Sequence, residues 1–214
     1  MGIKKKIYQT IRERILYMEY KPGQILNEKI LAKEFEISRS PVKDVLNHLE
    51  WEQFVRVIPR TGSMVTEIEF SKVMNIYQVR FEIEAFEARL AGNRFSSKHS
   101  EKLKILYDSC TKLLDKKNHK ALVKIDTSLR DIIHDAAGNP VLAKVSDRLY
   151  WQTFRLWFTI LSTGNWHEEV TAVINELGNL LESFSLGSIK KMEEIRRNQL
   201  SSHFERLRHK FLGN

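Results

Sequence analysis

The chain has 214 residues, of which 42% are hydrophobic and 29% charged, a balance that is typical of folded globular proteins and excludes a disordered chain. Its formal net charge of +8 favours a polyanionic partner, although ribosomal, membrane-surface and nucleic-acid-binding proteins all share such a charge. The single cysteine, Cys110, excludes an intramolecular disulfide framework. No apolar run approaches the roughly eighteen residues of a membrane span, and no signal peptide is recognisable, so we expect a soluble cytoplasmic protein.

The beginning of the chain predicts helices separated by a tight turn. Isoleucines at four-residue spacing predict a helix over residues 3–18. The turn at Tyr20–Gly23 combines Pro with Gly, which are the strongest local breakers of regular structure. Asn27 is a favoured N-cap residue, and a second, shorter helix is expected from there through Phe35.

A third helix and a hairpin are predicted next. Ser38 is expected to cap a helix that runs to about Glu52. Segments 54–58 and 64–66 alternate like short strands on either side of the turn at Pro59–Gly62. The order of three helices followed by a two-stranded wing is that of a winged helix-turn-helix.

The rest of the chain is poor in proline and rich in charged, helix-favouring residues. Apolar stripes at helical spacing predict amphipathic helices, with breaks at Gly138–Pro140 and Gly187–Ser188. We expect about six helices, hence an antiparallel bundle, and place the domains at 1–68 (winged helix-turn-helix) and 69–214 (all-helical). The predicted core stripes are Ile76, Val79, Ile83, Phe86 and Leu90; Ile125, Leu129, Ile132 and Ala136; and Leu200, Phe204, Leu207 and Phe211.

The most specific pattern lies in the first domain. It consists of Pro22-Gly23, Leu26, Glu28, Leu31-Ala32, Ile37-Ser38-Arg39-Ser40-Pro41-Val42-Lys43, Val45-Leu46 and the wing Val57-Ile58-Pro59-Arg60-Thr61-Gly62. At this spacing the pattern resembles the winged helix of GntR-family transcription regulators. The resemblance implies binding to double-stranded DNA. One departure is Gln53, where the family usually has glycine; a left-handed cap there costs about 1 kcal/mol relative to glycine.

The chemistry of the matched residues suits DNA recognition. The N-terminus of a helix presents free N–H groups to phosphate, and the guanidinium of Arg39 is expected to read guanine in the groove. Lys43 is a point charge and is expected to contact phosphate. The full set of expected DNA-binding residues is Lys29, Ser38, Arg39, Ser40, Lys43 and, on the wing, Arg60, Thr61 and Gly62. The alternative is that these are solvated charges on a helix surface.

The second domain is similar to the FCD-type effector domain of the same family. The matching segments are Tyr77-Gln78-Val79-Arg80 with Glu84, Ala88-Arg89-Leu90-Ala91 and Ala136-Ala137-Gly138-Asn139-Pro140. Many members of this group bind Zn²⁺ or a similar ion through an Asp and three His. The corresponding positions hold Asp126, Arg130, Leu177 and Gln199, with His203 one turn after Gln199. Because arginine does not ligate metals, we expect neither a metal nor another cofactor.

An organic anion is the expected effector instead. Arg130, with Arg80, is expected to bind a carboxylate through a bidentate pair, and Asp126, Gln199 and His203 complete the candidate effector site. Alternatively, Asp126 neutralises Arg130 one turn away on the same helix. The aromatic residues of one helix line a pocket or form core or dimer interface; they are Trp151, Phe154, Trp157 and Phe158.

The function predicted from the sequence is that of a homodimeric transcription regulator, a repressor, that binds a palindromic operator and responds to a small-molecule effector. An enzyme is not expected, because no catalytic triad order, P-loop or dinucleotide fingerprint is present. Two other functions stay open. A metal-dependent enzyme in a helical bundle needs more ligands than Asp126, His134 and His203, and a nonspecific architectural nucleic-acid binder predicts no sequence preference.

Overall fold

The computed structural model describes residues 2–186 and 188–212. The chain divides into two compact units. The first comprises the chain up to Val73 together with Trp151–Phe158 of a later helix, and the second comprises the remainder. The inclusion of Trp151–Phe158 in the first unit was not anticipated from the sequence, which placed the whole of 69–214 in one domain.

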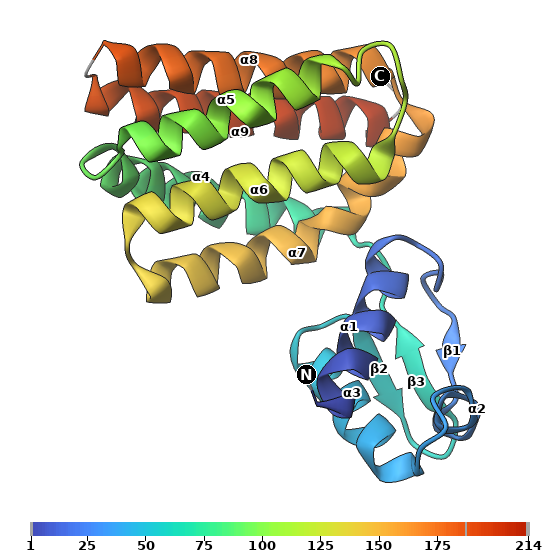
Figure 1. Cartoon of the computed structure of the whole chain (residues 1–214). Helices are drawn as coiled ribbons and strands as arrows, with labels where there is room; N and C mark the ends of the chain where they lie inside the picture. Colours follow the sequence, from blue (N-terminus) through green and yellow to red (C-terminus); the bar gives the residue numbers. More distant parts are fainter. Residues whose placement is uncertain (1, 187, 213–214) are drawn as a thin grey trace. The chain divides into compact units, whose positions relative to one another are not determined.

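The first unit is a winged helix-turn-helix (Figure 1). Its wing is an antiparallel sheet of strand order β1-β3-β2, which is one strand more than the sequence pattern predicted. The additional strand, β1, pairs with β3 and is only two residues long, too short for alternation to reveal it. In chain order the elements are α1 (Ile3–Leu16), β1 (Ile25–Leu26), α2 (Glu28–Glu34), α3 (Arg39–Trp51), β2 (Val55–Ile58) and β3 (Gly62–Val65).

Local capping explains where the short helices begin and end. Asn27 accepts hydrogen bonds from the backbone N–H groups of Lys29 and Ile30, as its position predicted. Ser38 holds the N-cap position of α3, but its side chain makes no capping hydrogen bond, contrary to expectation. Gln53 has a φ of +69°, so this residue takes the left-handed conformation that ends α3 where glycine is usual.

The second unit is built mainly from six helices in the described part of the chain. Figure 1 shows α5, α8 and α9 running alongside one another, and α5 also packs against α6. Within the described residues, no helix is both long and apolar enough to span a bilayer. The helices are α4 (Phe70–Gly92), α5 (Ser97–Thr111), α6 (His119–Ala137), α7 (Pro140–Thr163), α8 (Trp166–Ser185) and α9 (Ile189–Leu212).

The predicted break between α6 and α7 is confirmed, since Gly138 has a φ of +60° and Pro140 occupies the first turn of α7. The break predicted at Gly187–Ser188 falls between α8 and α9, but Gly187 lies outside the described residues.

The predicted core stripes have different outcomes. The α6 stripe is buried throughout, and on α9 Leu200 and Leu207 are buried whereas Phe211 is exposed. The prediction for α4 is confirmed at Ile76, which is buried, but wrong for Val79 and Phe86, which are 48% and 39% exposed. The buried side of α4 carries apolar side chains near its start and small and charged side chains after them: Val73, Ile76 and Tyr77, then Ala85, Ala88 and Ala91 with Arg80, Glu84 and Glu87. Apolar residues at helical spacing identify one face of a helix, but they cannot show that this face is the one buried against the other helices.

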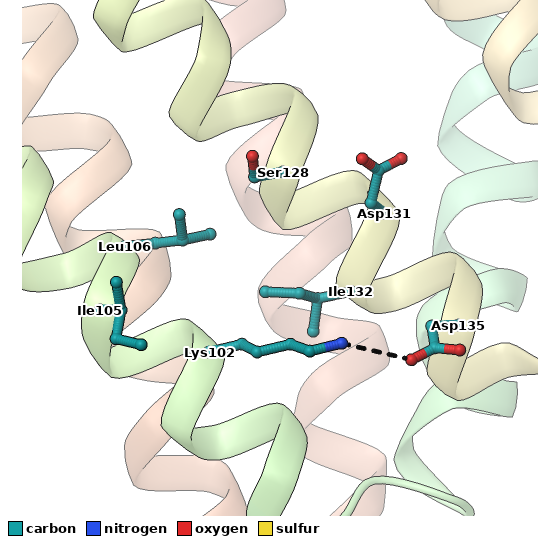
Figure 2. A pocket seen from close by; sticks show the side chains of 7 residues that line it. All are labelled: Lys102, Ile105, Leu106, Ser128, Asp131, Ile132 and Asp135. Atoms are coloured by element: carbon teal, nitrogen blue, oxygen red, sulfur yellow. Dashed lines mark ion pairs between the residues drawn. The ribbon is translucent and has the colours of Figure 1, made fainter.

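A surface hollow of about 530 Å³ lies between α5 and α6 (Figure 2). Apolar side chains form part of its lining, and an ion pair of 3.6 Å joins Lys102 Nζ to Asp135 Oδ2 at its edge. The lining residues are Lys102, Ile105, Leu106, Ser128, Asp131, Ile132 and Asp135. None of them belongs to the effector site expected from the sequence.

Candidate DNA-binding surface and buried polar cluster

The N-terminal end of α3 is open to solvent. Ser38, Arg39, Ser40 and Lys43 are all exposed, and the first backbone N–H groups of a helix lack partners within the helix. The uncommitted hydroxyl of Ser38 adds a further group at this end. Such an end, with its partial positive charge, is a ready site for a phosphate.

The basic side chains around this end are available to a ligand. The side chain of Arg39 is 68% exposed, and its Nη2 lies 3.5 Å from Oε2 of Glu28 on α2. An exposed pair of this length contributes little free energy, so it can orient Arg39 without preventing it from binding elsewhere. Among the described residues, Lys29, Lys43 and Arg60 have no carboxylate partner within 4.0 Å.

The turn of the wing depends on two unusual backbone conformations. Arg60 has a φ of +65° and Gly62 a φ of +140°. A Cβ atom at position 62 would come 2.7 Å from the backbone oxygen of Leu26 on β1, so only glycine fits there. The turn is closed by the N–H of Thr61, which donates to the oxygen of Ile58. Arg60 and Thr61 are thereby presented, exposed, at the tip.

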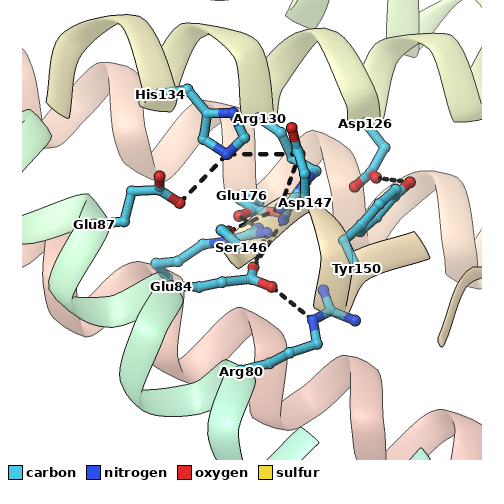
Figure 3. Close-up of polar contacts among 11 residues, drawn as sticks. Arg80, Glu84, Glu87, Asp126, Arg130, His134, Ser146, Asp147, Tyr150 and Glu176 are labelled. Atoms are coloured by element: carbon cyan, nitrogen blue, oxygen red, sulfur yellow. Dashed lines mark hydrogen bonds and ion pairs between the residues drawn. The ribbon is translucent and has the colours of Figure 1, made fainter. Parts of the chain in front are cut away.

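The second unit encloses a cluster of charged side chains around Glu84 (Figure 3). The carboxylate of Glu84 lies 2.6 Å from Arg80 and 3.1 Å from Arg130. Arg196 on α9 is also 2.6 Å from Glu84 and makes a second ion pair with Glu176 on α8. Each of these five side chains belongs to a residue no more than 5% exposed. Four helices therefore contribute to one buried ionic network, which we call the Glu84 cluster.

Burial and charge act against each other in the Glu84 cluster. Burial raises the pKa of Glu84, but Arg80, Arg130 and Arg196 outweigh this effect and hold the pKa well below its usual range. The pKa of Glu176 is raised, because burial exceeds the stabilisation that Arg196 supplies. The cluster thus holds three guanidiniums around one firmly ionised carboxylate.

Arg130 also contacts α7. Its Nη2 donates to Oγ of Ser146 at 2.9 Å, and its guanidinium lies 4.3 Å from the ring centroid of Tyr150. The hydroxyl of Tyr150 donates to Asp126 at 2.7 Å. The alternative in which Asp126 neutralises Arg130 is therefore not what is observed. Arg130 forms its ion pair with Glu84, and Asp126 accepts a hydrogen bond from Tyr150.

Three polar atoms beside the cluster lack hydrogen-bond partners. They are Nε of Arg130, Oε1 of Glu87 and Nε2 of His134, all of them buried. His134 lies between Glu87 and Asp147, with its Nε2 at 3.4 Å and 3.9 Å from their carboxylates. Buried polar groups are normally satisfied, so this region retains capacity for an additional hydrogen-bonding group.

The remaining expected effector residues have other partners. Gln199 donates to the backbone oxygen of Ala172 at 3.1 Å. The His203 ring lies 6.2 Å from that of Tyr77, and its Nδ1 is 3.5 Å from Arg206. Burial, assisted by nearby arginines, lowers the pKa of His203 to about 3. Arg80 and Arg130 therefore share the carboxylate of Glu84, and Asp126 is joined to Tyr150 beside them. The hydrogen bond of Gln199 and the contact of His203 with Arg206 are made to other residues.

Sequence reasoning missed Glu176 and Arg196, which complete the cluster. Glu84 had been noted only as part of the matching pattern. No local signal marks Glu176 or Arg196, since both stand among many charged residues on amphipathic helices.

The residues at the family's metal positions do not fit a metal ion. Of Asp126, Arg130, Leu177 and Gln199, only Asp126 supplies a good ligand, and Leu177 is fully buried core. Across residues 2–186 and 188–212, no group of three or more His, Cys, Asp or Glu is arranged to hold a metal. The three candidate ligands of a metal enzyme contact different residues: Asp126 contacts Tyr150, His134 contacts Glu87, and His203 contacts Arg206.

Fold and surface together define a class: a winged helix-turn-helix with an exposed recognition-helix terminus, in one chain with a helical domain that encloses a polar cluster. Residues 3–65 match the family described as bacterial regulatory proteins, gntR family, and residues 75–208 match the FCD domain. The chain belongs to the GntR family of bacterial regulatory proteins, in the group that carries an FCD domain.

Individual relatives agree with this assignment. The chain is 31% identical over 85 residues to the HTH-type transcriptional regulator YdhC of Bacillus subtilis, covering 40% of this chain and 38% of YdhC. It is 25% identical over 154 residues to the HTH-type transcriptional repressor RspR of Escherichia coli, covering 71% of this chain and 63% of RspR. The chain thus spans less than two thirds of each relative. The structure of E. coli McbR/YncC has the same fold, with a TM-score of 0.86, 17% identity and 99% coverage of both chains.

Proposed function

We propose that this protein is a transcription regulator that binds operator DNA through α3 and the wing, and that an organic anion bound in the helical domain changes its affinity for DNA. The observation that carries the proposal is the solvent-exposed N-terminal end of α3, with Arg39 68% exposed. A recognition helix buried at this end could not enter a groove. The family assignment and the net charge of +8 support the same function.

In this proposal the residues divide by role. Arg39 reads base edges, because a guanidinium forms two parallel hydrogen bonds to guanine. Lys43, Lys29, Ser38 and Ser40 contact phosphates beside the groove. On the wing, Arg60, Thr61 and Gly62 approach the adjacent minor groove.

A homodimer is the proposed DNA-binding form. The outer face of α4 carries Val79 and Phe86, both exposed, with half-buried Ile83 and Leu90 at helical spacing between and beyond them. A contiguous apolar face of this kind supports association with a second copy, which in turn favours a palindromic operator. In sedimentation experiments Val79→Glu should lower the mass to that of a monomer. Ile105→Glu, at a more exposed position on α5, should not.

An organic anion, carrying a carboxylate, is the proposed effector. Three buried guanidiniums and the unpartnered Nε of Arg130 support this choice, since a bidentate carboxylate can use donors that Glu84 leaves free.

Repression as the direction of control, a cytoplasmic location and a domain division near residue 68 are further parts of the proposal. The name of the relative RspR supports the first of these.

Selection of bound sequences from a random DNA library tests the main claim. The expected result is one short palindrome bound far more tightly than other DNA. Arg39→Ala should relax the preference at one position by about 1–3 kcal/mol, whereas Lys43→Ala should weaken binding to all sequences alike. If the library yields no consensus, or if Arg39→Ala discriminates as well as the unchanged protein, the proposed function is wrong.

A panel of small carboxylic acids tests the effector. At least one acid should raise the thermal unfolding temperature of the unchanged protein, since a ligand that binds only the folded state stabilises it. Arg130→Gln should abolish the shift, while Arg197→Gln, an exposed arginine on α9, should retain it. An acid-induced shift that survives Arg130→Gln would place the effector elsewhere.

A further inference from the structure

Helix α7 belongs to both units of the chain. It is one helix over Pro140–Thr163, yet Tyr150 and the residues before it belong to the second unit whereas Trp151–Phe158 belong to the first. Asp147 and Tyr150 contact the Glu84 cluster through Arg130. Five residues later, about 7.5 Å along the helix axis, Arg155 lies among residues of the winged helix. The helix therefore carries groups of the candidate effector site and of the winged helix on one backbone.

Arg155 binds the segment that follows the wing. Its Nη1 donates to the backbone oxygen of Thr66 at 2.6 Å, and its Nη2 donates to Oγ1 of Thr66 at 2.9 Å and to the oxygen of Glu67 at 3.4 Å. The residue is only 5% exposed, and these three acceptors are uncharged backbone and hydroxyl oxygens. Burial lowers the pKa of Arg155 to about 10, with partial opposition from Glu67. Burying a guanidinium costs free energy, and this cost indicates that the charge has a specific role at this position.

Thr66 in turn holds the end of the recognition helix. Its Oγ1 donates to the backbone oxygen of Gln53 at 2.9 Å, and its N–H donates to the oxygen of Phe54 at 3.0 Å. Gln53 is the left-handed residue that ends α3, and the N–H of Phe54 closes that end by donating to Leu49. Two hydrogen-bonded steps thus connect α7 to the C-terminal end of α3.

A second connection runs through aromatic residues of the first unit. The guanidinium of Arg12 on α1 lies 4.5 Å from the ring centroid of Trp151 and 3.6 Å from the carboxylate of Glu52, the C-cap residue of α3. The ring of Tyr17 packs edge-on against those of Phe154 and Phe158, at 5.8 Å and 5.1 Å. The α7 segment is therefore part of the winged helix's own core.

We propose that α7 transmits the state of the Glu84 cluster to the recognition helix, with Arg155 and Thr66 as the positioning residues that link α7 to the end of α3. This inference rests on the proposed function. A ligand that displaces Arg130 moves Tyr150, and because a helix is stiff over five residues, Arg155 moves with it. Thr66 follows through its hydrogen bonds to Arg155 and to the end of α3, and the helix that reads DNA is reoriented.

A double-mutant cycle tests the coupling without knowledge of the effector. Tyr150→Phe removes the hydrogen bond to Asp126, and Arg155→Lys keeps the charge but cannot span the same acceptors. The dissociation constant for the DNA sequence selected by the unchanged protein is measured for both single variants and for the double variant. The two effects should depart from additivity by a factor of at least about three. Arg208→Lys, an exposed arginine on α9 paired with Glu205, should combine additively with Tyr150→Phe.

Hydrogen exchange supplies a readout that needs no DNA. In Tyr150→Phe the amide hydrogens of Thr66 and Phe54 should exchange faster than in the unchanged protein, while those in the middle of α1 should not. Additive effects on the dissociation constant, or unaltered exchange at Thr66, overturn the coupling. A protein that selects no DNA sequence overturns the proposed function, and exchange at Thr66 then decides the coupling separately.

Discussion

Replacing Glu84 with glutamine tests the electrostatic account of the helical domain most directly. Glu84 is 2% exposed and lies within 3.1 Å of Arg80, Arg130 and Arg196. Glu84→Gln leaves the three buried guanidiniums with Glu176, which pairs with Arg196, and with the partly exposed Asp147, which lies 3.5 Å from Arg130. Removing one partner of a buried ion pair costs about 3–5 kcal/mol. In a chain of this size that loss lowers the unfolding temperature by roughly 6–20 °C.

Thermal and urea unfolding measure the effect, and a residue on the same helix provides the control. Glu82 pairs with Arg197 at 2.7 Å on the surface, where an ion pair contributes little, so Glu82→Gln should leave the unfolding temperature almost unchanged. Because the pKa of Glu84 is held low in the folded state, its contribution is fully present above the pKa of the unfolded chain and is lost only as pH falls through the folded value. The cost of Glu84→Gln should therefore be the same at pH 8 and pH 6. Equal stabilities of the two variants, or a cost that disappears at pH 6, would refute the reasoning.

Three other changes have expected outcomes. Gln53→Gly should stabilise the protein by about 0.5–1 kcal/mol in urea unfolding, because φ at this position is +69°; no gain would mean that Gln53 is not strained. Gly62→Ala should destabilise the first unit by roughly 1–3 kcal/mol and weaken DNA binding, since its Cβ would meet the oxygen of Leu26 at 2.7 Å. Gly2→Ala, which meets nothing within 4 Å, is its control. The His203 pKa of about 3 predicts stability that is complete above the ordinary histidine pKa and falls as pH drops towards 3, by at most about 5 kcal/mol. His203→Gln should make the free energy of unfolding less dependent on pH between pH 6.5 and 4, and an unchanged pH dependence would contradict a neutral His203 ring in the folded protein.

The winged helix was predictable because its signals are local. Asn27 caps α2 through hydrogen bonds to residues two and three positions away, and Gln53 ends α3 by its own left-handed backbone conformation. Such signals are contained in a few adjacent residues and do not depend on the rest of the fold. β1 escaped prediction because two residues contain no period, and it exists only through its pairing with β3.

The candidate effector site was only partly predictable. Arg80 and Arg130 were identified through a family resemblance, but the pairing that governs them was not. Glu84 and Arg196 are separated by 112 residues and meet only when α4 and α9 pack together. The alternative in which Asp126 neutralises Arg130 is not observed, since the hydroxyl of Tyr150, from another helix, donates to Asp126.

What the sequence determined by itself is the order of the helices, the family and the set of residues proposed for DNA binding, because these follow from short-range periodicity, capping and motif spacing. Tertiary structure alone decided which face of α4 is turned inwards, which carboxylate each buried arginine binds, and that Trp151–Phe158 of α7 joins the winged helix. The physical reason is that burial and ion pairing depend on which surfaces meet in space. Helices with similar amphipathic patterns can satisfy those requirements in several ways, and only their packing selects one.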